Sequence, residues 1–265
     1  MIEASPFLPV NLTGKRVVVT AGANGIGKSI SEGYQSCGAT VFVCDIDEAA
    51  VSNTLLENAN MHGCVTDVSN VDAVNAMFNQ VERELGGVDI LVNNAGIAGP
   101  TAGITEISSG ELHATFATDL ESMFHCARCS VPFMRSAGEG CIINLSSVAG
   151  RLSFALRTPY SAAKWGVIGF TKSLALELGP EKIRVNAIQP GHVNTERFRR
   201  VTATKAEAVG STQKEIEADF LSVVAMRETV ETTDIANTAL FLSSEYGAAI
   251  TGQAISVCKG VEMMR

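Results

Sequence analysis

The sequence lacks the features that would direct the protein to a membrane or to nucleic acid. No apolar run reaches the length of a membrane span. Residues 1–9 lack the basic stretch and apolar core of a signal peptide. No block of lysine or arginine stands out, and the formal net charge is -8. We therefore expect a small-molecule substrate, and neither nucleic acid nor a membrane as a partner.

The cysteines and histidines lack the spacing of a metal site. Seven cysteines, an odd number, are scattered along the chain, and the pair Cys126 and Cys129 has no second pair nearby. Core packing is the better interpretation of that pair, and the four histidines show no ligand-like spacing either. We expect no metal, and we interpret the cysteines as reduced thiols of a cytoplasmic protein.

The chain also lacks any sign of a division into separate parts. No proline- or glycine-rich linker, short repeat or low-complexity segment interrupts its 265 residues, of which 46% are hydrophobic. One domain spanning residues 1–265 is therefore expected, with enough apolar material for a large core.

Short β-branched runs alternate with amphipathic stretches. Strands are expected at residues 16–20, 40–44, 63–66, 89–93, 141–145, 184–189 and 254–258, and helices at 25–37, 48–58, 71–85, 111–135, 159–178 and 232–243. This alternation predicts an α/β fold, a doubly wound, Rossmann-like parallel sheet of seven strands with helices on both faces. Ligands of such a sheet bind beyond the carboxyl ends of its strands.

A glycine-rich turn joins the first expected strand to the first expected helix. Glycine lets the backbone approach a ligand closely, and a helix N-terminus offers free N–H groups to anionic oxygens. The turn is therefore a candidate phosphate cradle, formed by Gly22, Asn24, Gly25, Ile26 and Gly27.

The second expected strand ends at Asp45, followed by Ile46, close to where a dinucleotide site has its acidic residue. A carboxylate there accepts both ribose hydroxyls of NAD and repels a 2′-phosphate, and Asn24 rather than a basic residue occupies the turn. We therefore expect NAD rather than NADP. The alternative is that Asp45 only begins a turn with Asp47.

Tyr160 and Lys164 lie four residues apart, which places them on one face of a helix. A phenol is a poor base at neutral pH, but a fixed ammonium one turn away favours the phenolate. Such a tyrosine can exchange a proton with an alcohol or carbonyl oxygen. Ser147, which follows the strand expected at 141–145, could hold the same oxygen.

Together these residues resemble the short-chain dehydrogenase/reductase family in its single-domain form. The resemblance covers residues 14 to about 260, and Ser147 precedes Tyr160 by thirteen residues, as in the family. It implies an NAD-dependent oxidoreductase that interconverts a secondary alcohol and a ketone by hydride transfer. Tyr160 would be the acid/base, Lys164 would favour its phenolate and bind the nicotinamide ribose, and Ser147 would position the reacting oxygen.

The resemblance also implies further cofactor contacts and an assembly. The adenine would lie at Asp67 and Val68, the ribose side would pack on residues 94–96, and the nicotinamide amide would meet residues after the Pro-Gly turn. These contacts would come from Asp67, Val68, Asn94, Ala95, Gly96, Pro190, Gly191, Val193 and Thr195, beside Tyr160 and Lys164. Members mostly form tetramers or dimers, so a homo-oligomer is expected, with a tetramer favoured.

The chain departs from the family pattern at Ala21, where glycine is usual, and at Asp119, where asparagine is usual. Alanine is tolerated at little cost only if φ is not positive there, and the remaining glycines should preserve the cradle. Asp119 keeps the backbone carbonyl used in the family's proton relay, and we count it among the catalytic candidates. Its carboxylate would stabilise the ammonium of Lys164; alternatively, the backbone does the work and the side chain is only tolerated.

The regions expected to form the substrate pocket are rich in basic residues. Ser147, Arg157 and His192 are the candidate substrate contacts, and further arginines stand at Arg151, Arg197, Arg199 and Arg200. Arginine suits a carboxylate or phosphate, which points to an anionic hydroxy compound, a polyol or a sugar as substrate. Alternatively, these arginines are solvated or pair with Glu196 and Glu207. The helical segment at about 195–224 is expected to form a lid.

Two other functions remain open on the sequence alone. The same tyrosine and lysine serve epimerases and dehydratases among the extended relatives, whose chains are usually longer. A non-catalytic, dinucleotide-binding regulatory protein is the second alternative, and Asp119 is the one feature that favours it.

Overall fold

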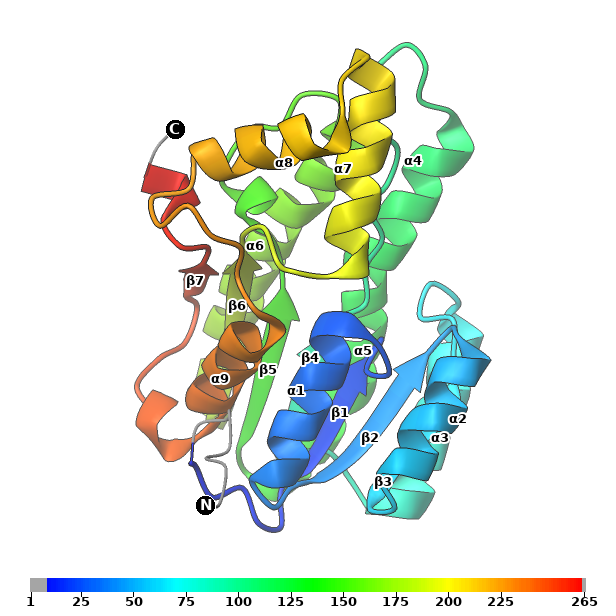
Figure 1. The fold of residues 1–265 in the computed structure, drawn as a ribbon. Coiled ribbons are helices and arrows are strands. Elements are labelled where there is room, and N and C mark those ends of the chain that lie inside the picture. Colours follow the sequence, from blue (N-terminus) through cyan, green and yellow to red (C-terminus); the bar gives the residue numbers. More distant parts are fainter. Residues whose placement is uncertain (1–8, 264–265) are drawn as a thin grey trace.

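The computed structural model describes residues 9–263, and residues 1–8, on which the signal-peptide interpretation depends, lie outside the described residues together with 264–265 (Figure 1). The described strands form one parallel sheet in the order β3-β2-β1-β4-β5-β6-β7. They are β1 (Arg16–Thr20), β2 (Thr40–Asp45), β3 (Met61–Val65), β4 (Ile90–Asn93), β5 (Gly140–Leu145), β6 (Ile183–Pro190) and β7 (Ala254–Val257).

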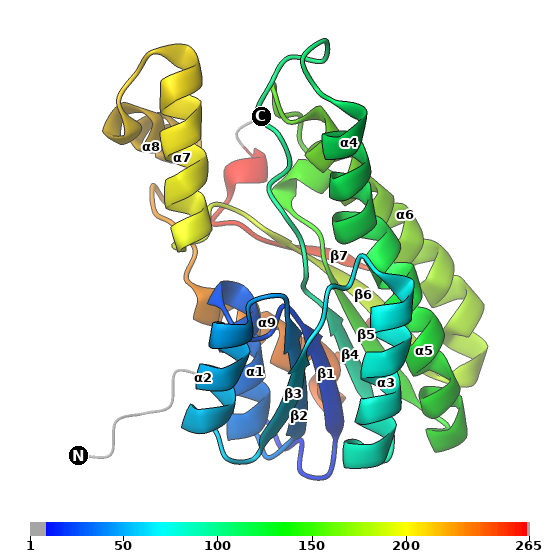
Figure 2. The same ribbon diagram turned by 90° about the vertical axis from the view of Figure 1, so that its right-hand side faces the viewer.

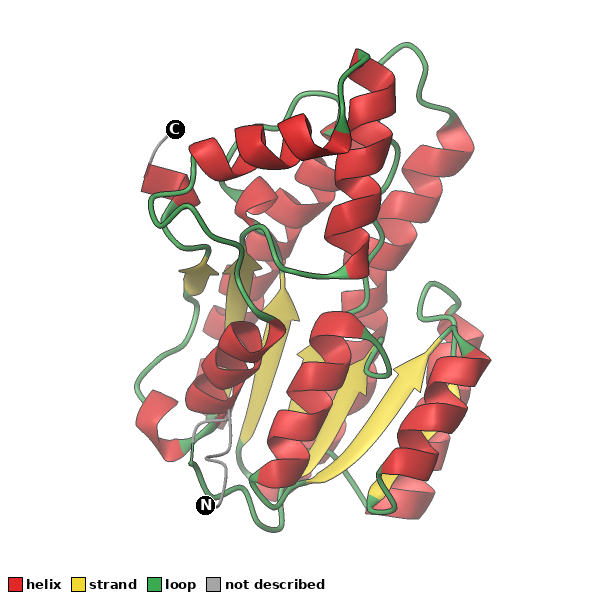
Figure 3. Cartoon of the chain, in the orientation of Figure 1, coloured by secondary structure: helices red, strands yellow, loops and turns green. Residues whose placement is uncertain are grey.

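Helices cover both faces of this sheet, which is edge-on between them in Figure 2 and yellow in Figure 3. The helices are α1 (Gly25–Ser36), α2 (Glu48–Glu57), α3 (Val71–Leu85), α4 (Ser109–Phe116), α5 (Ser122–Ala137), α6 (Thr158–Leu178), α7 (Glu196–Val209), α8 (Gln213–Ser222) and α9 (Thr232–Ser243). Helices α1, α2 and α9 lie on one face, and α3, α5 and α6 lie on the other. The expected doubly wound α/β fold is confirmed.

The central strand β1 shows why these runs are strands. Its side chains alternate, so that Val17 and Val19 pack with Ile30 of α1 on one face while Val18 packs with Val74 of α3 on the other. Because both faces are covered, the strand is apolar throughout rather than alternating with polar residues.

The sheet order reverses between β1 and β4, and the two strand ends are tied together there. The Thr20 Oγ1 accepts hydrogen bonds from the backbone N–H groups of Asn94 and Ala95, both at 3.0 Å. The Asn94 side chain donates to the carbonyls of Thr20 and Ala21, also at 3.0 Å. A crevice at such a reversal is where ligands of doubly wound sheets bind.

The helix expected at residues 111–135 is present but is not α-helical throughout. A π-helical segment, Ala117–Glu121, separates α4 from α5. A π turn holds one extra residue, which shifts the apolar periodicity only slightly. The sequence pattern therefore does not reveal the π-helical segment. A capping box formed by Ser108 and Glu111 begins α4.

The third strand differs from its expected range because it begins two residues earlier, at Met61. Met61 is buried and pairs with Val41 of β2 at the start of the ladder. The segment at about 195–224 is helical as expected and contains α7 and α8, which lie beyond the carboxyl ends of the strands.

Ala21 adopts a backbone conformation that the sequence interpretation did not anticipate. Its φ is +48°, in the left-handed region that favours glycine. The backbone of the glycine-rich turn is therefore strained at Ala21, since the left-handed conformation costs an L-residue roughly 1–2 kcal/mol.

We predict that Ala21→Gly stabilises the protein. Relief of the strain exceeds the added entropy of glycine in the unfolded chain, which leaves a gain of about 0.5 kcal/mol and a rise in Tm of roughly 1–2 °C in thermal unfolding. Ala23→Gly is the matched control, because Ala23 is buried and has no positive φ, and it should lower Tm. A fall in Tm for Ala21→Gly would show that the strain is not relieved.

Candidate active site

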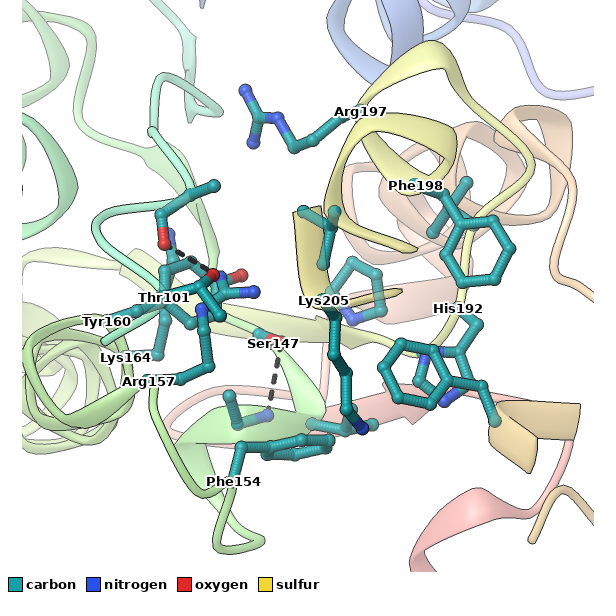
Figure 4. Close-up of a pocket in the computed structure, with 18 of the residues that line it drawn as sticks. Thr101, Ser147, Phe154, Arg157, Tyr160, Lys164, His192, Arg197, Phe198 and Lys205 are labelled. Atoms are coloured by element: carbon teal, nitrogen blue, oxygen red, sulfur yellow. Dashed lines mark hydrogen bonds between the residues drawn. The ribbon is translucent and has the colours of Figure 1, made fainter. Parts of the chain in front are cut away.

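A cavity of about 610 Å³ lies at the carboxyl end of the sheet, where Figure 4 shows α7 residues facing Tyr160 and Ser147. Its walls come from the ends of β4, β5 and β6, the start of α6, and α7 and α8. The sequence candidates that it brings together are Ile26, Asn94, Ser147, Arg157, Tyr160, Lys164, Pro190, Gly191, His192, Val193 and Thr195.

Lys164 carries a buried ammonium group on the inner face of α6. Its side chain is 5% exposed; its Nζ donates to the Leu145 carbonyl at 3.0 Å and lies 3.7 Å from Asp119 Oδ2. It also lies 5.7 Å from the ring centroid of Tyr160. The ammonium is therefore held in place one helical turn from the phenol, as the spacing predicts.

Asp119, in the π-helical segment, uses its side chain as well as its backbone. Its Oδ1 accepts the backbone N–H of Ile97 at 2.6 Å, whereas its buried Oδ2 has no hydrogen-bond partner among the described residues. Burial raises the pKa of this carboxyl above its usual range, against the opposing effects of Lys164 and of the Ile97 N–H. The Asp119 side chain therefore has contacts of its own, with the Ile97 N–H and the Lys164 ammonium.

Ser147 follows β5 and lines the cavity, with its Oγ accepting the Ala149 N–H at 3.1 Å. Its carbonyl accepts from the side chain of Gln189 in the neighbouring strand at 3.2 Å. The hydroxyl hydrogen is thus left to donate into the cavity, on the side shared with Tyr160 (Figure 4).

Arg157 lies against Tyr160 rather than in solvent. Its guanidinium is 4.6 Å from the Tyr160 ring centroid, and its Nη2 donates to the Ala98 carbonyl at 2.7 Å. Burial lowers the pKa of Arg157 from its usual value, while Tyr160 and Asp119 oppose that effect. Arg157 therefore presents a second positive charge to the phenol.

The other arginines divide between the cavity and the surface. The Arg197 Nη2 donates to the Gly96 carbonyl at 2.6 Å and so connects α7 to the loop after β4. Arg151 pairs with Glu262 at 3.2 Å, and Arg199 donates to Asn194 at 3.4 Å. In residues 9–263, no ion pair joins these arginines to Glu196 or Glu207. Arg151, Arg197, Arg199 and Arg200 are all exposed, so of the two alternatives to substrate binding it is solvation that describes them.

His192 belongs to an aromatic group on the opposite wall. Its ring stacks on Phe220 with centroids 4.9 Å apart, and Phe198 lies 5.7 Å away. Sequence reasoning missed Phe198, Phe220, Phe154 and Lys205, all of which line the cavity. For α7 the sequence does contain a pattern that could have found them. Three- and four-residue spacings place four of the lining residues on one face of the helix: Phe198, Val201, Lys205 and Val209.

The glycine-rich turn leads into α1 without a side-chain cap. Asn24 at the N-cap makes no side-chain hydrogen bond, whereas the N-caps of α2, α3, α4, α7 and α8 each accept an N–H from their first turn. The N–H groups of the first turn of α1 therefore stay available to an anionic ligand. Gly25 has φ +52°, and a Cβ on Gly27 would lie 1.9 Å from the Ala21 carbonyl oxygen.

Asp45, at the end of β2, is 8% exposed and faces this turn. One carboxylate oxygen lies 3.4 Å from the Ala23 N–H and the other accepts the Asp47 N–H at 3.2 Å. Asp45 thus begins a turn with Asp47 and is also directed at the cradle, which makes the two interpretations compatible. Ile46 beside it is exposed.

The remaining cofactor candidates follow the same edge of the sheet. Asp67 is exposed after β3 and accepts the backbone and hydroxyl of Ser69 at 2.9 and 2.7 Å, while Val68 is buried. A Cβ on Gly96 would lie 3.3 Å from Lys164 Nζ, and one on Gly191 would lie 2.8 Å from the Cα of Cys258.

Beyond the Pro-Gly turn, Val193 is buried and pairs with Val230, and Thr195 caps α7 by accepting the Phe198 N–H at 3.3 Å. Within residues 9–263, no group of three or more His, Cys, Asp or Glu side chains is arranged to hold a metal ion. In the same range, every helix is too short or too polar to cross a bilayer.

A family model described as enoyl-(acyl carrier protein) reductase matches residues 20–262. The chain belongs to the short-chain dehydrogenase/reductase family. It is therefore a member of an oxidoreductase family. A probable galactose dehydrogenase of Rhizobium meliloti is 35% identical over 95% of this chain and 96% of that protein. A 3-oxoacyl-[acyl-carrier-protein] reductase of Vibrio harveyi is 34% identical over 96% of this chain and 100% of that protein.

Solved structures of other family members place the same fold over nearly the whole chain. An actinorhodin polyketide ketoreductase variant with NADPH has a TM-score of 0.90 and 32% identity, covering 93% of this chain and 97% of its own. An NAD+-bound xylitol dehydrogenase also has a TM-score of 0.90, with 26% identity over 94% of this chain and 99% of its own. These two family members differ in both cofactor and named activity.

We predict that Asp119→Asn stabilises the protein in a pH-dependent way. Burial raises the folded-state pKa of Asp119 above the unfolded value near ~3.9, so the ionised carboxylate weakens folding above the folded-state pKa. This cost shrinks as pH falls through the folded-state pKa and is gone below the unfolded value. The gain in Tm should be largest at pH 8 and shrink toward pH 4 in thermal unfolding. Asp219→Asn, at an exposed position, should show no such trend.

Proposed function

We propose that this family member is an NAD-dependent oxidoreductase that interconverts a secondary alcohol and a ketone. The observation that carries the proposal is the shared cavity of Ser147, Tyr160 and Lys164, with the ammonium held by Leu145 and Asp119. A non-catalytic regulatory protein would have no need for a buried ammonium beside a cavity-lining phenol.

The residues present suit a dinucleotide. The uncapped N-terminus of α1 offers N–H groups to the pyrophosphate, and Asp45 would accept the adenosine ribose hydroxyls. Asp67 and Val68 would meet the adenine, Asn94, Ala95 and Gly96 would pack beside the riboses, and Pro190, Gly191, Val193 and Thr195 would face the nicotinamide. When bound, the nicotinamide accepts or supplies the hydride.

Two features support NAD over NADP. Asp45 would place a negative charge against a 2′-phosphate, and Ile46 beside it offers no cation. Lys28, the basic residue nearest the turn, pairs with Glu57 at 2.7 Å. A carboxylate therefore already pairs with this ammonium.

In the oxidation direction, Ser147 donates a hydrogen bond to the alcohol oxygen and Tyr160, as phenolate, takes its proton. In the reduction direction the tyrosine returns that proton to the carbonyl oxygen. Lys164 and Arg157 stabilise the phenolate electrostatically, from 5.7 and 4.6 Å measured to the ring centroid. Asp119 keeps the Lys164 ammonium oriented.

We further propose that α7 and α8 form a lid and that the chain assembles as a homo-oligomer, as the family resemblance implies. The lid is supported by the α7 residues that line the cavity. Assembly is supported by the outer face of α5 and α6, where Phe124 and Trp165 are 51% and 53% exposed and Phe124 contacts Phe170 with ring centroids 4.3 Å apart.

We predict that purified protein reduces NAD, measured at 340 nm, with at least one compound in a panel of secondary alcohols, polyols, sugars and hydroxy acids. Tyr160→Phe should lower kcat by roughly 10²–10⁴-fold, because the proton acceptor is lost. Tyr246→Phe, at a position 65% exposed and outside the cavity, is the matched control and should retain full activity. NAD binding without turnover of any compound would favour the regulatory alternative.

We predict that Asp45→Asn shifts the ratio of kcat/KM for NAD over that for NADP by about tenfold toward NADP. Loss of one repulsive charge near the 2′-phosphate corresponds to about 1.4 kcal/mol. Asp47→Asn, an exposed residue that caps α2, should leave the ratio unchanged. Wild-type protein that prefers NADP would contradict the assignment of Asp45.

A further inference from the structure

The residues that line the cavity carry more positive than negative charge, and Asp119, behind Lys164, is the carboxylate that lies close to one of these cations. Among the described residues, four lysines and arginines line it and no aspartate or glutamate does, although the chain as a whole carries a net charge of -8. A neutral sugar or polyol has no use for this concentration of charge. An anionic ligand would be drawn to it.

Three of the four cations already have partners within the protein. Lys164 bonds the Leu145 carbonyl and faces Asp119, Arg157 bonds the Ala98 carbonyl, and Arg197 bonds the carbonyl of Gly96. Their charges contribute to the field in the cavity, but their positions are fixed by these bonds.

Lys205 is different. Its Nζ lies 4.3 Å from the ring centroid of Phe220, and within the described part of the chain it has no carboxylate at ion-pair distance. Figure 4 shows its side chain extending from α7 into the cavity, between the walls that carry Ser147 and His192. An aromatic face holds an ammonium group in place but satisfies none of its three N–H donors, which remain for a ligand.

The surroundings of Lys205 are apolar. Phe198, Val201 and Val209 share its face of α7, Phe220 lies beneath its ammonium, and Phe154 completes the lining across the cavity. Such walls suit a ring or a branched carbon skeleton rather than a row of hydroxyl groups. A charge anchored among them is also worth more than one in open water.

We propose that Lys205 binds a carboxylate of the substrate, so that the substrate is a hydroxy or oxo acid in which an apolar body separates the carboxylate from the reacting carbon. This proposal depends on the oxidoreductase function proposed above and names the substrate class of that site. The carboxylate takes no part in the chemistry. The alcohol carbon loses a hydride to NAD and its hydroxyl loses a proton to Tyr160. The carboxylate is retained without change in the ketone product.

The test compares two matched ligands by isothermal titration calorimetry. 4-Phenylbutyrate and 4-phenylbutanamide share one carbon skeleton and differ in the terminal group, which is an anionic carboxylate in the first and a neutral amide in the second. Neither can be turned over as an alcohol or a ketone. In wild-type protein saturated with NAD, the acid should bind at least about 10-fold more tightly than the amide, since a charge-assisted hydrogen bond replaces a neutral one. Lys205→Met should remove most of this preference, since the other three cations supply only the general field, and continued binding of the amide would show that the variant is folded.

Lys214→Met is the matched control, because Lys214 lies exposed on α8 outside the cavity, and it should keep the full preference for the acid. Equal affinities in the wild type, no detectable binding of either ligand, or a preference that survives Lys205→Met would each overturn the proposal. Tighter binding of 3-phenylpropyl phosphate than of the acid would overturn the assignment to a carboxylate.

Titrations without NAD are run in parallel, which separates this proposal from the proposed function. A protein that binds no NAD and oxidises no alcohol would refute the function, while the two ligands would still report on Lys205. Conversely, turnover of neutral alcohols with no preference for the acid would refute the role of Lys205 and leave the function intact.

Discussion

The buried ammonium of Lys164 is the charge around which the site is organised. An ion removed from water costs several kcal/mol unless neighbouring groups replace its hydration. Two separate segments supply those groups, the end of β5 through the Leu145 carbonyl and the π-helical segment through Asp119. A third, the loop after β4, leaves room beside the Nζ at Gly96. The lysine thereby fixes the relative positions of the elements that also carry Ser147 and Tyr160.

Asp119 shows that this arrangement has a cost of its own. Its carboxylate offsets the lysine charge from 3.7 Å, yet burial disfavours the ionised form, and only Oδ1 receives a hydrogen bond from the described residues. The pair is therefore a compromise between two desolvation costs rather than a strong contact. Arg157, whose guanidinium lies 4.6 Å from the phenol ring centroid, adds a second positive charge close to Tyr160.

Much of the architecture could be predicted from the sequence because it depends on local patterns. Buried parallel strands are continuous apolar runs, and all seven were found, with β3 displaced by two residues at its start. The candidates at strand ends meet at one edge, since parallel strands all end there. The π-helical segment was missed because one extra residue barely alters apolar periodicity, and the positive φ of Ala21 was missed because alanine rarely adopts it. Lys205 escaped notice because the sequence shows charges but not which of them find partners.

The two sides of α6 face different surroundings, so tryptophan fluorescence and signals from a bound ligand report on different parts of the molecule. Lys164 faces the cavity, while the adjacent Trp165, about 100° further around the helix and the chain's one tryptophan, is 53% exposed on the outer face. Intrinsic indole emission therefore reports the environment of that outer face. A change in it with protein concentration records contact between copies of the chain, whereas events inside the cavity must be followed through the absorbance or emission of the ligand itself.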